Sequence, residues 1–148
     1  MNESAAREME LTLPLISDFE ITAAQAAMDL ARVLGMGDEP VDELAHAIIE
    51  ACINVREHAG CADERIYLRF AGSTLNGQPR LEVWIMDHGR GFDFKEVKDR
   101  QRKRREGPRK RGWGLQIMEA HMDEVEIDSG DMGTTVRMVK LGRRRNDD

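Results

Sequence analysis

The sequence predicts one α+β domain, a two-layer sandwich in which helices pack on one face of a mixed, mostly antiparallel sheet. The chain has 148 residues, of which 41% are hydrophobic, and this is enough for one domain with its own core. Segments with helical spacing of apolar residues alternate with segments rich in β-branched and aromatic residues. A turn signal, NGQP at residues 76–79, separates two of the strand-like segments and favours a hairpin. Together these observations favour a largely antiparallel sheet covered by helices on one side.

The N-terminal part of the chain is predicted to form one strand and two helices. Residues 8–16 alternate weakly between apolar and polar side chains, as strands do. Residues 18–34 are rich in Ala, Leu and Met, and Gly35 follows them as a helix terminator. Residues 41–59 carry the clearest helical pattern, and Pro40 stands near the start of that helix.

The remainder of the chain is predicted to supply four strands and one helix. The strands are expected at residues 64–71, 80–87, 123–129 and 134–141, and the helix at residues 114–122. The last two strands are separated by a turn between Gly130 and Gly133. The polar tail, residues 142–148, is expected to be frayed. We expect residues 1–148 to form a single domain.

The charge of the chain is unevenly distributed. Residues 95–111, KEVKDRQRKRREGPRKR, contain ten Lys or Arg and three Asp or Glu and carry +7, so that the rest carries −13 within a total of −6. An acidic domain with one basic segment is not typical of a general nucleic-acid-binding protein, and its positive charge suits one anionic ligand or one acidic partner. Because the segment contains Gly107 and Pro108 and has no apolar period, we expect a mobile loop there.

The sequence indicates a cytoplasmic protein. It contains no run approaching the roughly 18 apolar residues of a membrane span, and its first residues lack the features of a signal peptide. Cys52 and Cys61 are nine positions apart, which corresponds to about 13 Å along a helix and is too far for a disulfide. The four histidines show no close Cys/His ligand spacing, so no structural zinc is expected.

Polar residues within the predicted helix at 41–59 are the first candidates for a functional site. An apolar stripe recurs at three- and four-residue steps, through Leu44, Ala47, Ile48, Ala51, Cys52, Val55 and Ala59. Glu50 and Asn54 lie one helical turn apart, and Ile49 and Ile53 lie on their other side. Polar groups flanked by apolar residues on both sides need partners. The partners can be internal hydrogen bonds or a bound ligand, and the helix alone leaves both open.

Two glycine-rich segments are the next candidates. Leu81, Val83 and Ile85 alternate along a strand that ends at Asp87, and in DHGRGFD the glycines Gly89 and Gly91 permit close approach of the backbone to a ligand. A carboxylate at that position can accept a hydrogen bond from an amino group. Taken alone, the motif is a weak signal, and a glycine-rich turn after a strand explains it better.

The second of these segments is RGWGLQIME, residues 111–119, in which two glycines lead into a helix. The free N–H groups at a helix start attract phosphate, and the basic residues before it would add to that attraction. A flexible entry into the helix is the alternative. The segment GTTVRMV at residues 133–139, with Thr134 after a turn glycine, is ordinary in isolation.

The order and spacing of these segments resemble the nucleotide-binding fold shared by sensor histidine kinases, gyrase and the related heat-shock chaperone. Glu-x-x-x-Asn on a helix is followed by Asp-x-Gly-x-Gly, a long loop, Gly-x-Gly-Leu and finally Gly-Thr. Within this superfamily the chain looks most like the anti-sigma-factor serine kinases of the RsbW/SpoIIAB type. The phrases EACINVREHA, DHGRGFD, GLQIMEAHMDEVEI and GTTVRMVK carry that likeness, which extends from about residue 8 to residue 141.

The resemblance implies a role for each matching residue. Asn54 matches the asparagine that binds Mg²⁺ between the nucleotide phosphates, and Glu50 matches the acidic residue proposed as general base. Asp87 matches the aspartate that accepts a hydrogen bond from the adenine amino group, and Thr134 the threonine near the adenine. The oxygen of Asn54 also suits a hard cation on chemical grounds.

Two glycine-rich segments and the lid between them account for the rest of the implied site. Gly89 and Gly91 match the lining of the adenine pocket, and residues 94–111 match the lid over the ATP. The hinge and phosphate-binding end of the lid correspond to Gly112, Gly114 and Leu115. The bulky Trp113 and the strongly basic lid depart from the family pattern and bear on lid geometry and phosphate contacts.

The activity implied by the resemblance is transfer of phosphate from Mg·ATP to a serine of a STAS-type anti-sigma-factor antagonist, combined with binding of a sigma factor. The expected ligands are ATP or ADP and Mg²⁺, and members of this family are commonly homodimers. The alternative is a nucleotide-dependent binding module with little or no kinase activity. The catalytic core of a sensor histidine kinase is disfavoured, because 148 residues leave no room for a helical dimerisation domain.

Overall fold

The computed structural model describes residues 7–58, 64–87, 113–130 and 133–144. In chain order the elements are β1 (Arg7–Pro14), α1 (Phe19–Val33), α2 (Asp38–His58), β2 (Arg65–Leu75), β3 (Gln78–Met86), α4 (Trp113–His121), β4 (Glu124–Gly130) and β5 (Gly133–Leu141). Every helix and strand predicted from the sequence is present, with ends that differ by a few residues. No helix within these ranges has the length and apolar character that crossing a bilayer requires.

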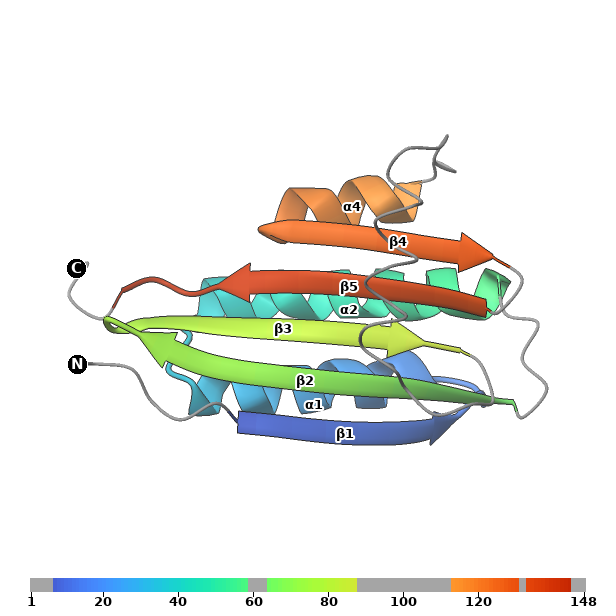
Figure 1. Ribbon diagram of the computed structural model, residues 1–148, viewed down its shortest axis with the longest axis horizontal. Coiled ribbons are helices and arrows are strands. Elements are labelled where there is room, and N and C mark those ends of the chain that lie inside the picture. The colour runs from blue at the N-terminus through green and yellow to red at the C-terminus, as the bar shows by residue number, and fades with distance from the viewer. Residues whose placement is uncertain (1–6, 59–63, 88–112, 131–132, 145–148) are drawn as a thin grey trace.

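The strands form one open sheet in the order β1-β2-β3-β5-β4. Every neighbouring pair in the described part of the chain is antiparallel, so the expectation of a mixed sheet was wrong on this point. The reason lies in α4, which carries the chain back along the sheet before β4 begins (Figure 1). As a result β4 runs in the same direction as β3, but β5 lies between the two strands.

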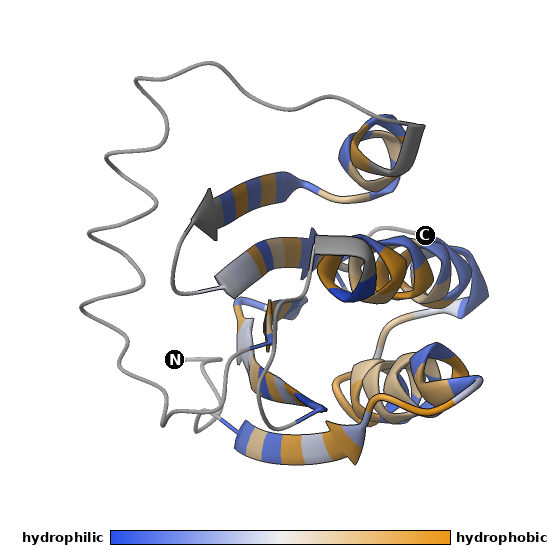
Figure 2. Ribbon diagram, turned by 90° about the vertical axis from the view of Figure 1, so that its right-hand side faces the viewer, coloured by the Kyte–Doolittle hydropathy of each residue, from blue (hydrophilic) through white to orange (hydrophobic). Residues whose placement is uncertain are grey.

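The helices α1, α2 and α4 lie on one face of the sheet, which confirms the two-layer architecture (Figure 1, Figure 2). Their apolar sides turn toward the strands, and the polar sides turn away (Figure 2). The core between the layers is built from alternate residues of the strands and from the helical stripes. Among the largest fully buried side chains are Phe70, Leu44, Ile48, Ile66, Leu81 and Ile85.

Helix α2 forms the centre of the helical layer. The stripe predicted from the sequence is fully buried from Leu44 to Val55. The helix begins at Asp38, three residues before the predicted start, because Pro40 is accommodated in the first turn, where its missing N–H has no helical acceptor to lose. The Val41 N–H already donates to the carbonyl of Gly37 at 3.1 Å.

The β2–β3 hairpin confirms the turn that NGQP predicts. Leu75 lies opposite Gln78, so the loop consists of Asn76 and Gly77 only. Both residues have positive φ, 52° and 78°, which is the signature of the tight turn that suits the strand twist.

The C-terminal tail begins later than predicted. Gly142 was expected to be frayed, yet it is buried and its N–H donates to the carbonyl of Pro79 at 2.9 Å. A Cβ at this position would lie 3.0 Å from Met36 Cγ, so the close contact favours glycine. The end of β5 is therefore fastened to the β2–β3 hairpin.

Candidate functional site

Four of the predicted site segments meet at one end of the molecule. The second half of α2, the end of β3, the start of β5 and the start of α4 all point toward the end on the right in Figure 1. The site therefore draws on both the helical layer and the sheet. Gly89, Gly91, Gly112 and the predicted lid at residues 94–111 lie outside the described residues.

Asp87 and Thr134 are joined by two hydrogen bonds. The Thr134 N–H donates to Asp87 Oδ1 at 2.6 Å, and the Asp87 N–H donates to the Thr134 carbonyl at 3.3 Å. Both residues are completely buried, and they continue the helix-facing rows of β3 and β5. A carboxylate held in this way has a fixed orientation, as recognition of one ligand atom requires. Sequence reasoning placed the two residues in one site but did not foresee that the Thr134 backbone orients the Asp87 carboxylate.

Glu50 and Asn54 lie one turn apart in the second half of α2, and both are half-buried. The Oδ1 atom of Asn54 is shielded from solvent and has no hydrogen-bond partner among the described residues. A buried acceptor without a partner costs about 1–3 kcal/mol, so such groups are rare unless a ligand completes them. This observation favours a ligand at the Glu50/Asn54 row over the internal hydrogen bonds that the sequence left open.

Helix α4 begins at Trp113, so Gly114 and Leu115 stand in its first turn. The backbone N–H groups of a first turn have no acceptor within the helix. The Leu115 side chain is 5% exposed and belongs to the core. The backbone N–H groups of Gly114 and Leu115 are therefore the groups available to a phosphate. The Leu115 side chain packs in the core and holds the helix in place.

Cys52 on α2 is fully buried and reduced. Burial, reinforced by Glu20 and partly opposed by Arg56, raises the pKa of its thiol far above the ordinary value. The thiol therefore stays protonated and serves as part of the core.

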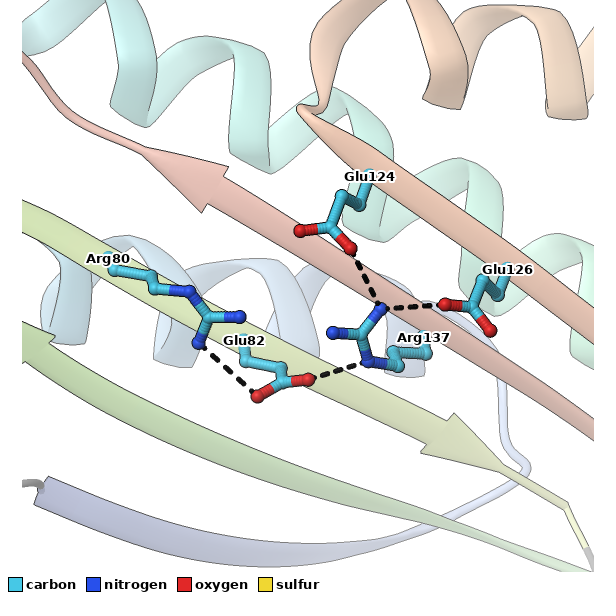
Figure 3. A network of polar contacts seen from close by, with 5 residues as sticks. All are labelled: Arg80, Glu82, Glu124, Glu126 and Arg137. Carbon is cyan, nitrogen blue, oxygen red and sulfur yellow. Dashed lines mark hydrogen bonds and ion pairs between the residues drawn. The ribbon is translucent and has the colours of Figure 1, made fainter. Parts of the chain in front are cut away.

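The sheet face opposite the helices carries a network around Arg137 that sequence reasoning missed (Figure 3). Its Nε donates to Glu82 at 2.6 Å, and its Nη1 donates to Glu126 at 2.9 Å and to Glu124 at 3.3 Å. Arg80 contacts Glu82 at 3.3 Å from the other side. Burial lowers the pKa of Arg137, but Glu82 and then Glu126 and Glu124 outweigh burial and raise it.

The network spans three strands, and its members could not be paired before the register was known. Arg137 on β5 lies directly opposite Glu126 on β4. Glu82 on β3 lies opposite Val139, which is two residues after Arg137 on β5. The only signal in the sequence is the alternation of charged with apolar residues along these strands, which marks a face without naming partners.

A polar cleft of about 290 Å³ lies at the opposite end of the molecule from Asp87. It is lined by Glu39, Pro40, Glu43, Gln78, Asp123, Lys140, Leu141, Gly142 and Arg143. None of the residues predicted for the site lines it, so the cleft is not the predicted nucleotide site.

Comparison with known proteins agrees with the fold. Residues 20–140 match the family described as the histidine kinase-like ATPase domain. The chain belongs to this family of ATPase domains.

Among curated proteins, the serine-protein kinase RsbW of Bacillus licheniformis is 31% identical over 158 aligned residues, which cover 97% of this chain and 92% of that protein. RsbW of Bacillus pumilus is also 31% identical, over 99% of this chain and 93% of that protein. Within the ATPase family the chain therefore belongs to the RsbW group of serine-protein kinases, a class that uses ATP.

A solved structure shows the same fold. The structure of the RsbU and RsbW domains of Rv1364c from Mycobacterium tuberculosis matches with a TM-score of 0.62 at 22% identity. The match covers 93% of this chain and 33% of that longer one, so this chain corresponds to about a third of it.

Proposed function

We propose that this protein transfers phosphate from Mg·ATP to a serine of an anti-sigma-factor antagonist, and that it binds a sigma factor as the other half of a partner switch. The observation that carries the proposal is the shielded Asn54 Oδ1, which has no partner among the described residues and lies one turn from Glu50. Membership of the RsbW group supplies the class of reaction. The sigma factor and the STAS-type antagonist are inferred from that group.

The residues of α2 fit a magnesium ion. An amide oxygen is a ligand that Mg²⁺ accepts, and the ion usually completes its shell with waters and phosphate oxygens. Asn54 would hold the metal, which would neutralise charge on the phosphates during transfer. The shielded acceptor of Asn54 supports this assignment.

The adenine would be recognised by Asp87. Its carboxylate is buried and oriented by the Thr134 backbone, and it would accept a hydrogen bond from the amino group of adenine. Guanine presents a carbonyl at that position. The site would thus prefer ATP or ADP to GTP, with Gly89 and Gly91 lining the adenine pocket.

The phosphates would approach the start of α4, where Gly114 and Leu115 stand in the first turn, and the backbone N–H groups of these residues and of Gly112 would bind them. Glu50 would accept the proton of the attacking serine hydroxyl. It forms no hydrogen bond or ion pair with another residue in the described ranges, which leaves its carboxylate available for that role. Positioning and charge neutralisation supply most of the catalysis in phosphoryl transfer.

The proposal extends to the organisation of the protein. Residues 1–148 would form one ATP-binding domain, which is supported by the presence of β1 and β5 in a single sheet. The domain would act in the cytoplasm as a homodimer, as members of this family commonly do. The alternative function is a nucleotide-dependent binding module without kinase activity.

The test is transfer itself. The purified protein is incubated with γ-labelled ATP, Mg²⁺ and candidate antagonists encoded in the same genome. Label on an antagonist serine is the expected result. Tight ATP binding without transfer to any antagonist would instead establish the binding module.

A further inference from the structure

Lys140 occupies a position at which a charged residue is unexpected. Along β5 the side chains of Thr134, Val136 and Met138 face the helices and are fully buried, and Lys140 is next in that row. It is 7% exposed. A buried ammonium group is costly unless it is paired and hydrogen-bonded. The sequence already indicates this burial, because Lys140 follows Val136 and Met138 at the two-residue spacing of one face of a strand.

The partners of Lys140 connect three elements. Its Nζ donates to Glu43 Oε1 on α2 at 3.1 Å and to the backbone carbonyl of His121, the last residue of α4. A cation at the C-terminal end of a helix satisfies a free carbonyl and complements the helix dipole. Lys140 therefore ties the end of α4 both to α2 and to β5.

The rest of α4 is held mainly by apolar contacts with α2. Leu115, Met118 and the following Met122 are buried, whereas contacts between α4 and the sheet are few. The helix has nine residues and is thus a rigid rod of about 14 Å. Because its sheet contacts are few, the contact of Lys140 with the His121 carbonyl adds a fixed point at the C-terminal end of the helix to the packing of α4 on α2.

We propose that Lys140 is a positioning residue for the nucleotide phosphates, acting through α4. This inference rests on the proposed function, in which the first turn of α4 binds the phosphates. Loss of the ammonium would leave Glu43 and the His121 carbonyl without their shared donor and loosen α4 at its end. The N–H groups of its first turn would then no longer be preorganised for phosphate.

The adenine end of the site should not respond to this change. Asp87 and Thr134 are held by their own two hydrogen bonds and by the ladder between β3 and β5. A positioning role for Lys140 therefore affects phosphate binding separately from adenine binding, whereas a general structural role would affect both together.

The experiment compares ATP with adenosine, which lacks every phosphate. Lys140→Met keeps an unbranched side chain of nearly the same length and removes the ammonium. We expect it to weaken Mg·ATP binding by about tenfold or more, as loss of a charge-assisted hydrogen bond would, and to change adenosine binding less than about twofold. ATP is titrated by calorimetry, and adenosine by NMR chemical shifts.

Matched variants complete the test. Arg143→Met removes a cation from an exposed residue of the same polar cleft and should bind both ligands as the wild type does. Lys140→Arg should restore part of the ATP affinity. If Lys140→Met does not fold, Glu43→Gln weakens the same set of contacts and should show the same selective loss of ATP affinity to a smaller extent.

Two results would overturn the proposal: a folded Lys140→Met that binds ATP like the wild type, or one that loses ATP and adenosine affinity equally. Failure of the wild type itself to bind ATP would overturn the proposed function, and with it the premise of this inference.

Discussion

The outer face of the sheet and the second half of α2 both shield polar groups from solvent, but the two regions differ in whether these groups have partners. On the outer face the Arg137 guanidinium, 12% exposed at its side chain, is surrounded by three carboxylates within hydrogen-bonding distance. On α2 the Oδ1 atom of Asn54 is just as well shielded and has no partner in the described part of the chain. Among the described residues, the first arrangement is complete and the second is not.

The difference separates stability from function. A buried polar network whose members satisfy one another rigidifies a fold, and removal of one member leaves uncompensated charge. An unsatisfied acceptor lowers stability, and its persistence in a well-packed helix is explained if a ligand completes it. Substitutions in the two regions should therefore have opposite consequences for folding and for nucleotide binding.

The largest expected effect is on binding, at Asn54. Asn54→Ala should abolish Mg²⁺-dependent nucleotide binding while lowering the free energy of unfolding by less than about 1 kcal/mol, because the lost oxygen has no hydrogen-bond partner among the residues that the structure describes. Urea unfolding and thermal shifts with and without Mg·ATP measure the two quantities. The exposed Asp42, in the first half of the same helix, provides the control variant Asp42→Ala. A large ATP-induced thermal shift persisting in Asn54→Ala would contradict a metal role.

Arg137 should show the reverse pattern. Arg137→Ala removes the cation that Glu82 and Glu126 share, and because these side chains are only 13% and 16% exposed the loss should cost up to about 3 kcal/mol of unfolding free energy. Nucleotide affinity of the folded fraction should be unchanged. Arg80→Ala is the matched control, because that side chain is 39% exposed and makes one contact with Glu82, worth about 0–1 kcal/mol. Equal destabilisation by the two variants would show that the network is not centred on Arg137.

A smaller effect on affinity is expected when the adenine of the nucleotide is replaced by guanine. If the Asp87 carboxylate recognises the adenine amino group, GTP should bind more weakly than ATP by about 1–3 kcal/mol. Asp87→Asn should also weaken ATP binding. Calorimetry with both nucleotides measures the difference, and equal affinities for ATP and GTP would remove Asp87 from the adenine pocket.

Most of the fold was accessible from the sequence because local patterns define it. The stripe from Leu44 to Val55, the alternation from Leu81 to Ile85 and the turn at Asn76 and Gly77 each depend on residues close in sequence. The direction of β4 was not accessible, because it depends on where α4 ends. The register that brings Arg137 to Glu126 is likewise set between strands.

For the site, the sequence supplied candidate residues, whose roles stay predictions, but not their geometry. The positions of Glu50, Asn54, Asp87 and Thr134 followed from motif order. The reciprocal bonding of Asp87 with Thr134 requires residues 47 positions apart to meet, and no local pattern shows it. The contact between Lys140 and the end of α4 also joins distant segments. The strand pattern alone indicated only that Lys140 lies on the buried face of β5.

The most direct test of a kinase built on the α2 row concerns Glu50. Glu50→Gln keeps the shape of the side chain and removes the basic carboxylate, so it should bind Mg·ATP nearly as well as the wild type and still retain the sigma factor. General base assistance is typically about 10²–10⁴-fold, so transfer of labelled phosphate to the antagonist serine in a single turnover should be at least about 100-fold slower. A Glu50→Gln protein that transfers phosphate at the wild-type rate would contradict the account, because the carboxylate beside Asn54 would then not be the base.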